Sequence, residues 1–250
     1  MPKQAGIIRL ERDGPPGVGL ERMDLDPADF ASGLPEQRIH VYFADEAIGL
    51  TVGVWTTTGM QEAFGPYPGD EFMLVLEGRV VMEDGHGGAV PVETGQSFVI
   101  RNAIPVSWKQ VGAMRKFFLL LHDAEAPVPQ IASAEGGVIV MDPEALRRGL
   151  RDEAEMIGGG HQQDNCVFTN DAGTMSVGLW TSTAFETDMQ PFSVHEFVQI
   201  LDGHVAITEG SGATHAFGPG DVFFIPAGTV CSWASDGAVS KYYATVTPTS

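Results

Sequence analysis

Short runs of hydrophobic or alternating residues, separated by glycine, proline and aspartate, recur along most of the chain. In the first half these runs cover residues 50–56, 71–76, 79–83, 97–101 and 115–122. Runs of this length between turn-forming residues are typical of β-strands. Two sites instead predict helices, because an aspartate that can cap a helix precedes a proline at the first helical position. A helix is expected from Asp142-Pro143 through residues 144–155, and a shorter one from Asp26-Pro27.

The second half of the chain repeats the first at an offset of 125 residues. At this offset 21 of the 70 positions from Val52 to Leu121 are identical to their partners, without a gap. Two copies of one domain explain this identity. We expect an N-terminal domain over residues 1–125, with its core at about 38–122, and a C-terminal domain over residues 126–250, with its core at about 163–247. Residues 126–130, Ala-Pro-Val-Pro-Gln, are the expected linker.

The predicted elements favour an all-β protein. Many evenly spaced short strands and few helices, in domains of this size, are typical of a sandwich or a closed barrel. We expect the two barrels to pair with each other within the chain, since such packing covers strand edges that otherwise promote aggregation. Association of two copies of the chain into a homodimer is a further possibility.

Charge and composition narrow the partners. Acidic residues outnumber basic ones by 33 to 14, a formal net charge of −19 at pH 7. No nucleic acid and no membrane surface is expected as a partner, because both are bound mainly through Lys and Arg. No apolar run approaches the roughly 20 residues of a membrane span, and no signal peptide is evident. With only Cys166 and Cys231, we expect a cytoplasmic protein with reduced thiols.

Two spaced motifs resemble those of the cupin superfamily. The second repeat has Glu-x6-Gly from Glu196 to Gly203 and Gly-x5-Pro-x-Gly from Gly220 to Gly228. The first repeat keeps the glutamate, Glu71, but has Arg-Asn-Ala where Pro-x-Gly would stand. The Trp after Pro-Ala-Gly and the late Lys-Tyr-Tyr are similar to the cupin-3 type, which includes ureidoglycine aminohydrolase-like and ethanolamine-utilisation cupins. The resemblance implies a bicupin of two tandem RmlC-like jelly-roll barrels.

The metal ligands of that family are missing here. Its pattern has histidines six and four residues before the motif glutamate, and a third three residues after Pro-x-Gly, which together hold a divalent transition metal. The second repeat has Gln190, Phe192 and Cys231 at these positions, and the first has Gly65, Tyr67 and Val106. We therefore expect no usual cupin metal, because one carboxylate with an amide and a thiol holds a first-row metal weakly.

A metal in the second repeat would have to use Glu196, Gln190, Cys231 and His195. Of these, His195 immediately precedes Glu196, so the period of two of a strand turns it to the opposite face. His195 is therefore a weaker candidate for a metal ligand than the residues at the motif positions.

A lysine at the same place in both repeats suggests another partner for the glutamates. Residues 152–240 contain no Lys or Arg, and the first base to follow, Lys241, aligns with Lys116. A carboxylate buried in a barrel needs a compensating cation or must become protonated. Our hypothesis is that Glu71–Lys116 and Glu196–Lys241 pairs replace the metal and form the candidate catalytic groups. The alternative is a surface lysine at the end of each last strand.

Several further side chains are expected to surround the glutamates. The candidate pocket residues are Gln190, Phe192, Cys231, Trp233, Tyr67 and Trp108. The aromatic ones could instead fill the barrel core, as side chains do in small barrels. Cys231 could be a reactive thiolate only beside a cation, and a small buried cysteine is the alternative.

Three functions remain open at this point. The first is a small-molecule enzyme, a hydrolase, lyase or isomerase, with Glu196 as acid or base and Lys241 as its charge partner. The second is a non-catalytic ligand-binding or regulatory protein with filled barrels. The third, implied by the resemblance, is a metal-dependent ureidoglycine aminohydrolase-like enzyme, against which the missing histidines argue.

Overall fold

A computed structural model describes residues 6–84, 87–122, 134–153 and 158–248. The chain forms two compact units, Glu11–Met141 and Met1–Leu10 together with Asp142–Ser250. The expected linker at residues 126–130 lies outside the described residues. Within the described part, the helices are too short or too polar to cross a membrane.

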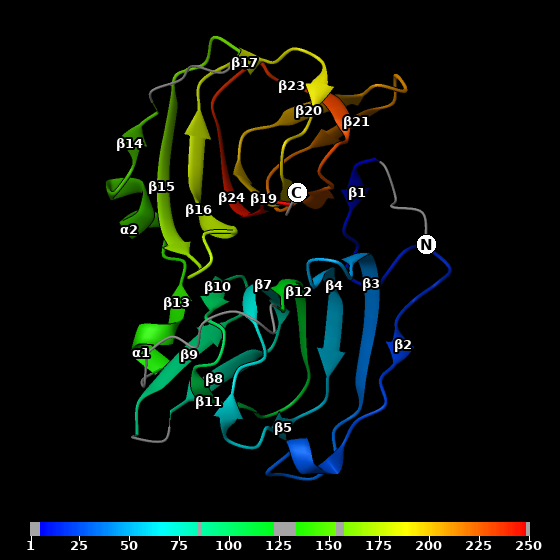
Figure 1. The fold of residues 1–250 in the computed structure, drawn as a ribbon, viewed down its shortest axis with the longest axis vertical. Coiled ribbons are helices and arrows are strands. Elements are labelled where there is room, and N and C mark those ends of the chain that lie inside the picture. Colours follow the sequence, from blue (N-terminus) through cyan, green and yellow to red (C-terminus); the bar gives the residue numbers. More distant parts are fainter. Residues whose placement is uncertain (1–5, 85–86, 123–133, 154–157, 249–250) are drawn as a thin grey trace. The chain divides into compact units, whose positions relative to one another are not determined.

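The unit Glu11–Met141 consists of two antiparallel sheets. Its strands are β2 (Glu21–Arg22), β3 (Gln37–Asp45), β4 (Leu50–Thr57), β5 (Met60–Gln61), β6 (Gly65–Pro66), β7 (Asp70–Glu77), β8 (Arg79–Glu83), β9 (Ala89–Glu93), β10 (Ser97–Ile100), β11 (Pro105–Gln110), β12 (Met114–Leu121) and β13 (Val138–Val140). The larger sheet has the order β13-β10-β7-β12-β4-β3-β2, and the smaller has β5-β11-β8-β9 with β6 beside β11 (Figure 1). The five runs expected as strands form β4, β7, β8, β10 and β12, each to within one residue at its ends.

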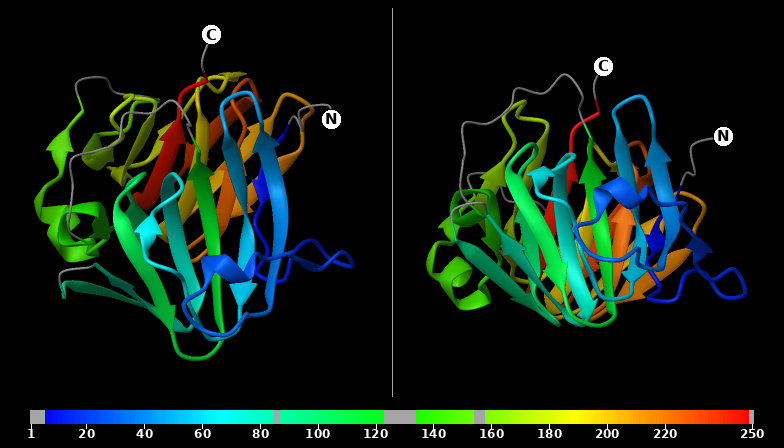
Figure 2. Two further views of the ribbon diagram at one scale, coloured as in Figure 1. Left: turned by 60° about the horizontal axis from the view of Figure 1, so that its bottom comes forward. Right: turned by 90° about the horizontal axis from the view of Figure 1, so that it is seen from below.

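The second unit repeats this arrangement. Its strands are β1 (Ile8–Arg9), β14 (Arg151–Asp152), β15 (Gln162–Thr169), β16 (Met175–Ser182), β17 (Phe185–Glu186), β18 (Gln190–Pro191), β19 (His195–Asp202), β20 (Val205–Glu209), β21 (Thr214–Phe217), β22 (Val222–Ile225), β23 (Val230–Ser235) and β24 (Val239–Val246). The larger sheet has the order β1-β22-β19-β24-β16-β15-β14, and the smaller has β17-β23-β20-β21 with β18 beside β23. In Figure 2 the later strands of this unit are coloured yellow to red. The fold is therefore all-β, with one jelly-roll barrel in each unit.

In the part of the chain that the structure describes, three short helices accompany the strands. They are η1 (Pro27–Asp29), a 3-10 helix, α1 (Ala134–Gly137) and α2 (Pro143–Arg148). The carboxylate of Asp142 accepts the backbone N–H groups of residues 144 and 145 at 2.9 and 3.1 Å, so the predicted helix start is confirmed. Its predicted continuation to residue 155 is wrong, because Gly149 ends the helix and β14 joins the sheet directly afterwards.

Each unit completes its larger sheet with a strand from the segment that leads into the other repeat. Strand β1 pairs with β22, with Ile8 opposite Phe224, and β13 pairs with β10. Arg9 fixes β1 further, since its guanidinium lies 2.5 Å from the Asp221 carboxylate and 4.3 Å from the centre of the Phe217 ring. Strand β1 thus belongs to the compact unit of the second repeat, and β13 to that of the first.

Strand alternation turns one face of each central strand into its barrel. Met73 and Val75 of β7 lie in the core of the first barrel, and Val198 and Ile200 of β19 lie in the core of the second. By the period of two, the motif glutamates Glu71 and Glu196 share these inward faces.

Ala103 has a backbone conformation that favours glycine. Its φ is 60°, and its counterpart Gly228 has φ 84°. A left-handed conformation costs a residue with a Cβ about 1–2 kcal/mol, partly offset by the greater freedom of an unfolded glycine. We expect Ala103→Gly to raise the free energy of unfolding by about 1 kcal/mol and Gly228→Ala to lower it by a similar amount. Urea denaturation of the two variants measures both. No heavy atom lies within 4 Å of a Cβ placed at Gly228, so crowding does not interfere, and a loss of stability in both variants would contradict the expectation.

Candidate active site

In the first barrel, Glu71 and Lys116 form a buried ion pair. Lys116 Nζ lies 2.7 Å from Glu71 Oε1 and 3.0 Å from the sulfur of Met73. Tyr67 donates its hydroxyl to Glu71 Oε2, so both carboxylate oxygens have a donor. Lys116 is only 7% exposed, which excludes the alternative of a surface lysine.

Aromatic side chains fill the space around this pair. Lys116 Nζ lies 4.8 Å from the ring centre of Trp108 and 5.1 Å from that of Trp55. The Trp108 indole N–H donates to Gln110 Oε1 at 2.7 Å. Tyr67 and Trp108 both belong to the hydrophobic core of this barrel. For these two candidates the core-filling alternative is the one the structure adopts.

The second barrel contains the equivalent pair. Lys241 Nζ lies 2.7 Å from Glu196 Oε1, and the two residues are 8% and 5% exposed. The ammonium lies 4.6 Å from the ring centre of Trp233 and 5.0 Å from that of Trp180. The structure therefore brings each predicted glutamate and lysine together, with tryptophans around them.

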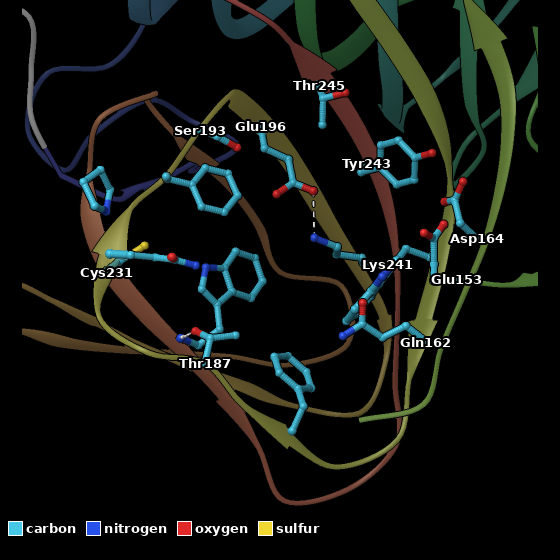
Figure 3. Close-up of a pocket in the computed structure, with 16 residues that line it drawn as sticks. Glu153, Gln162, Asp164, Thr187, Ser193, Glu196, Cys231, Lys241, Tyr243 and Thr245 are labelled. Atoms are coloured by element: carbon cyan, nitrogen blue, oxygen red, sulfur yellow. Dashed lines mark hydrogen bonds and ion pairs between the residues drawn. The ribbon is translucent and has the colours of Figure 1, made fainter. Parts of the chain in front are cut away.

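The second barrel contains a cavity of about 590 Å³ beside its ion pair (Figure 3). This volume lies within the usual range of small-molecule sites, roughly 300–1,000 Å³. The lining residues are Glu153, Gln162, Asp164, Trp180, Phe185, Thr187, Gln190, Pro191, Phe192, Ser193, Glu196, Cys231, Trp233, Lys241, Tyr243 and Thr245. The predicted pocket residues Gln190, Phe192, Cys231 and Trp233 are all among them.

The two repeats differ in the side chains beside the ion pair. Phe192 occupies the position of Tyr67 and has no hydroxyl to offer Glu196. Val198 replaces Met73, whose sulfur contacts the lysine in the first barrel. Among the described residues, Lys241 is the one donor to the Glu196 carboxylate, and the other oxygen is left to the cavity.

The cavity wall is also more polar than the same positions of the first barrel. At the offset of 125 residues, the substitutions from first to second repeat are Ile39 to Asp164, Phe118 to Tyr243, Leu120 to Thr245 and Pro68 to Ser193. Because both repeats form the same fold, the fold itself does not need these polar groups. These side chains give the wall polar groups with which a bound molecule can form hydrogen bonds.

Asp164 and Tyr243 form a hydrogen-bonded pair on this wall. Burial raises the pKa of Asp164, and the nearby Glu153 raises it further, against the opposing effect of the Tyr243 hydrogen bond. Burial and the Asp164 charge raise the pKa of Tyr243 well above its usual range, so the phenol stays protonated. Asp164 Oδ1 is buried and accepts no hydrogen bond from the described residues.

Cys231 and Gln190 lie at the edge of the cavity with different exposure. Cys231 is buried, and that burial raises the pKa of its thiol, so the side chain is not a thiolate at neutral pH. Gln190 is exposed and pairs with Cys231 in the register of β18 and β23. A small buried cysteine, the alternative to a nucleophile, fits this geometry.

The donor set does not fit a cupin metal. Among the described residues, no three His, Cys, Asp or Glu side chains are grouped so that they could hold a metal ion. His195 does not line the cavity: its ring stacks on Phe224 with centroids 6.0 Å apart, and its Nδ1 accepts the Ala227 N–H at 3.2 Å. Beside Glu196, the Lys241 ammonium already balances the carboxylate charge that a metal would balance.

A further carboxyl group lies close to the pair of the first barrel. Burial raises the pKa of Glu62 to about 7, with Glu71 adding to the rise and Lys116 opposing it. The folded protein therefore holds a proton that the unfolded chain loses above about pH 4.5, and stability falls as pH rises from 4.5 to 7. We expect Glu62→Gln to remove this fall, which is of the order of 2 kcal/mol after allowance for partial exposure. Thermal unfolding between pH 4.5 and 8 measures it, with Glu93→Gln, an exposed residue, as control. An unchanged pH profile would contradict the assignment.

Sequence reasoning missed several residues of the site. Trp180 lines the cavity, as do Asp164, Tyr243 and Thr245. The signal that could have revealed the last three was the change from apolar to polar residues between aligned positions. The positions at which the two repeats differ therefore mark the polar wall of the cavity.

Known proteins resemble this chain in both sequence and fold. Residues 169–243 match the model of the EutQ-like cupin domain. A crystal structure from Pseudomonas syringae pv. tomato, of a protein of unknown function in the DUF861 family, is 26% identical, covers 97% of this chain and 100% of that one, and has a TM-score of 0.78. Ylba from E. coli, also of the DUF861 family, is 12% identical with a TM-score of 0.55, covering 98% of this chain and 93% of its own.

More distant neighbours share the fold alone. A salicylate 1,2-dioxygenase from Pseudaminobacter salicylatoxidans is 13% identical with a TM-score of 0.55, over 79% of this chain and 71% of its own. No curated protein sequence matches this chain. The second repeat is therefore similar to EutQ-like cupin domains over residues 169–243, and the whole chain is similar to the DUF861 protein from Pseudomonas syringae, whose two-barrel cupin fold it shares.

Proposed function

We propose that this protein binds a small polar molecule in the barrel of its second repeat and that Glu196, paired with Lys241, exchanges a proton with it. One observation carries the proposal: two barrels share the same buried ion pair, but the barrel with the polar cavity is the one whose glutamate lacks a capping hydroxyl. The first barrel then has a structural role.

The pair suits general acid–base chemistry. Lys241 holds Glu196 Oε1 and compensates its charge, while the second oxygen can accept a proton from a bound molecule. A positioned acid or base typically contributes about 10²- to 10⁴-fold to a rate. Because Cys231 is a protonated thiol, a covalent step has no activated nucleophile, which favours an isomerase or lyase reaction, or hydrolysis by a water that Glu196 activates.

Lys241 replaces only one of the roles that a metal has in other cupins. It balances the charge of Glu196 but offers no open coordination position for a substrate. One structural neighbour is named as a dioxygenase. We do not propose that activity for this chain, because the described residues of this chain do not provide a metal site.

The test compares ligand binding in the natural protein and in Phe192→Tyr. This substitution places at the second site the hydroxyl that caps Glu71 in the first, and should fill the space beside Glu196 while retaining the fold. We expect a metabolite that stabilises the natural protein against heat to lose at least about tenfold in affinity in Phe192→Tyr. Tyr67→Phe, the reciprocal change in the other barrel, is the matched control and should leave affinity unchanged.

Turnover and metal content separate the alternatives. With a bound metabolite, Glu196→Gln should retain binding and lose turnover. Binding without any turnover in the natural protein would favour a non-catalytic receptor. Stoichiometric manganese, iron, nickel or zinc in protein purified without a histidine tag would contradict the Glu–Lys site and favour the metal-dependent alternative.

A further inference from the structure

The charges that line the second cavity do not balance. Glu153, Asp164 and Glu196 face a single cation, Lys241, among the lining residues. Lys241 lies 2.7 Å from Glu196, so these two charges largely cancel. Asp164, which is partly buried, therefore remains without a counter-ion in the lining, as does the exposed Glu153 at its edge. A cationic ligand would supply one, and the net charge of −19 would favour its approach.

The aromatic walls already hold one ammonium group. Lys241 Nζ lies within about 5 Å of the ring centres of Trp180 and Trp233, at 5.0 and 4.6 Å. Such distances are typical of cation–π contacts, in which the ring face attracts a positive charge. Further aromatic side chains, Phe185, Phe192 and Tyr243, line the same cavity. The wall is thus suited to a second cation as well as to apolar groups.

The register of the sheet places the uncompensated acid at a distance from the ion pair. Asp164 of β15 is opposite Trp180 of β16, and Trp180 is opposite Lys241 of β24. Cross-strand neighbours share a face, and strands are about 4.8 Å apart, so the backbones of Asp164 and Lys241 are about 10 Å apart with Trp180 between them. A small molecule can therefore contact Asp164 at one end and Glu196 at the other.

Asp164 also has an unused hydrogen-bond acceptor. Its Oδ1 is buried and accepts no bond from the described residues, while the Tyr243 hydroxyl and the backbone N–H groups of Asn165 and Cys166 donate to the carboxylate group. At the same position the first repeat has Ile39, which shows that the fold tolerates an apolar side chain there. An N–H group of a bound ligand would satisfy this acceptor.

Resting on the proposed function, we infer that the ligand of the second barrel carries a protonated primary or secondary amine, whose N–H groups bind Asp164 Oδ1 beside Trp180. Its remaining atoms extend toward Glu196 and Lys241. The inference names a class of ligand, small ammonium compounds, and the residue that selects it.

The test uses a matched panel of fragments: benzylamine, benzyl alcohol and benzoate, with n-butylamine, n-butanol and butyrate as a second skeleton. Binding is followed by NMR through the indole N–H signals of Trp180 and Trp233, assigned with Trp→Phe variants. We expect each amine to bind at least about tenfold more tightly than its alcohol and its carboxylate. Asp164→Asn, nearly equal in shape, should remove that preference and leave the affinity for the alcohols within about twofold.

Each outcome has a separate meaning. Alcohols or carboxylates that bind as tightly as the amines, or amines that bind Asp164→Asn unchanged, overturn the inference and leave the proposed function standing. If no fragment shifts either indole signal in the natural protein, the proposed function fails together with the inference. Asp236→Asn, an exposed aspartate outside the cavity, is the control for charge alone. Should Asp164→Asn fail to fold, Glu153→Gln replaces it, with a smaller loss of amine affinity expected.

Discussion

Lys116→Met is expected to destabilise the first barrel by about 3–5 kcal/mol, because it leaves the Glu71 carboxylate buried without its cation. The methionine fills a similar volume, so the loss reports the uncompensated charge. Hydrogen exchange of β7 and β12 amides measures the stability of this barrel separately from the other, which a single unfolding transition of a two-domain chain does not.

Two variants sharpen this prediction. The double variant Glu71→Gln with Lys116→Met should recover most of the loss, since a buried pair replaced by neutral groups is often neutral or stabilising. Lys241→Met should cost less than Lys116→Met, because the cavity beside Glu196 admits water. Equal losses in the two barrels would contradict this expected difference in hydration.

Tyr67→Phe should lower the stability of the first barrel by about 1.5–3 kcal/mol, the usual contribution of a hydrogen bond to a charged group. Burial raises the pKa of Tyr67 well above its usual range, and Glu71 raises it further, so the hydroxyl remains a donor throughout the accessible pH range. The change leaves Glu71 Oε2 without a donor while keeping the ring. Urea denaturation at pH 7 and hydrogen exchange of β7 provide the measurement.

The reciprocal variant serves as the control for Tyr67→Phe. Phe192→Tyr should be neutral or stabilising, because it adds a donor where Glu196 has an open oxygen. A loss below about 0.5 kcal/mol in Tyr67→Phe would show that water or another group replaces the phenol.

The repeat made the fold and the paired charges predictable. Glu71 and Lys116, together with Glu196 and Lys241, are conspicuous because they recur at the same offset in a chain with few basic residues. The side to which the lysines point was not predictable, because one residue of shift in register turns every side chain of a strand to the opposite face. The register shift in the pairing of β7 with β12, between Arg115 and Lys116, is a feature of this kind that composition does not reveal.

The difference between the two barrels was harder to predict. Whether Tyr67 and Trp108 line a cavity or fill a core depends on volumes several strands apart, such as those of Met73 and Met60, which no local pattern records. Asp164 was missed because its strand, β15, has a mixed sequence that does not alternate clearly, and a shift in register occurs within it. Helix α2 was expected to be too long because its composition continues to favour a helix, whereas the sheet requires β14.

The exchanged edge strands bear on how such a chain could have arisen from one repeat. A single-repeat ancestor with the same connectivity would leave the edge of β10 or β22 open unless a second copy supplied the leading strand, as in a strand-swapped dimer. Joining the two copies by a linker makes that exchange intramolecular and replaces a dependence on protein concentration with a fixed effective concentration in the millimolar range. In a fused chain the two copies no longer need to have the same sequence. One barrel can then retain a fully hydrogen-bonded ion pair that stabilises it, while the other lacks the tyrosine hydroxyl and contains a cavity.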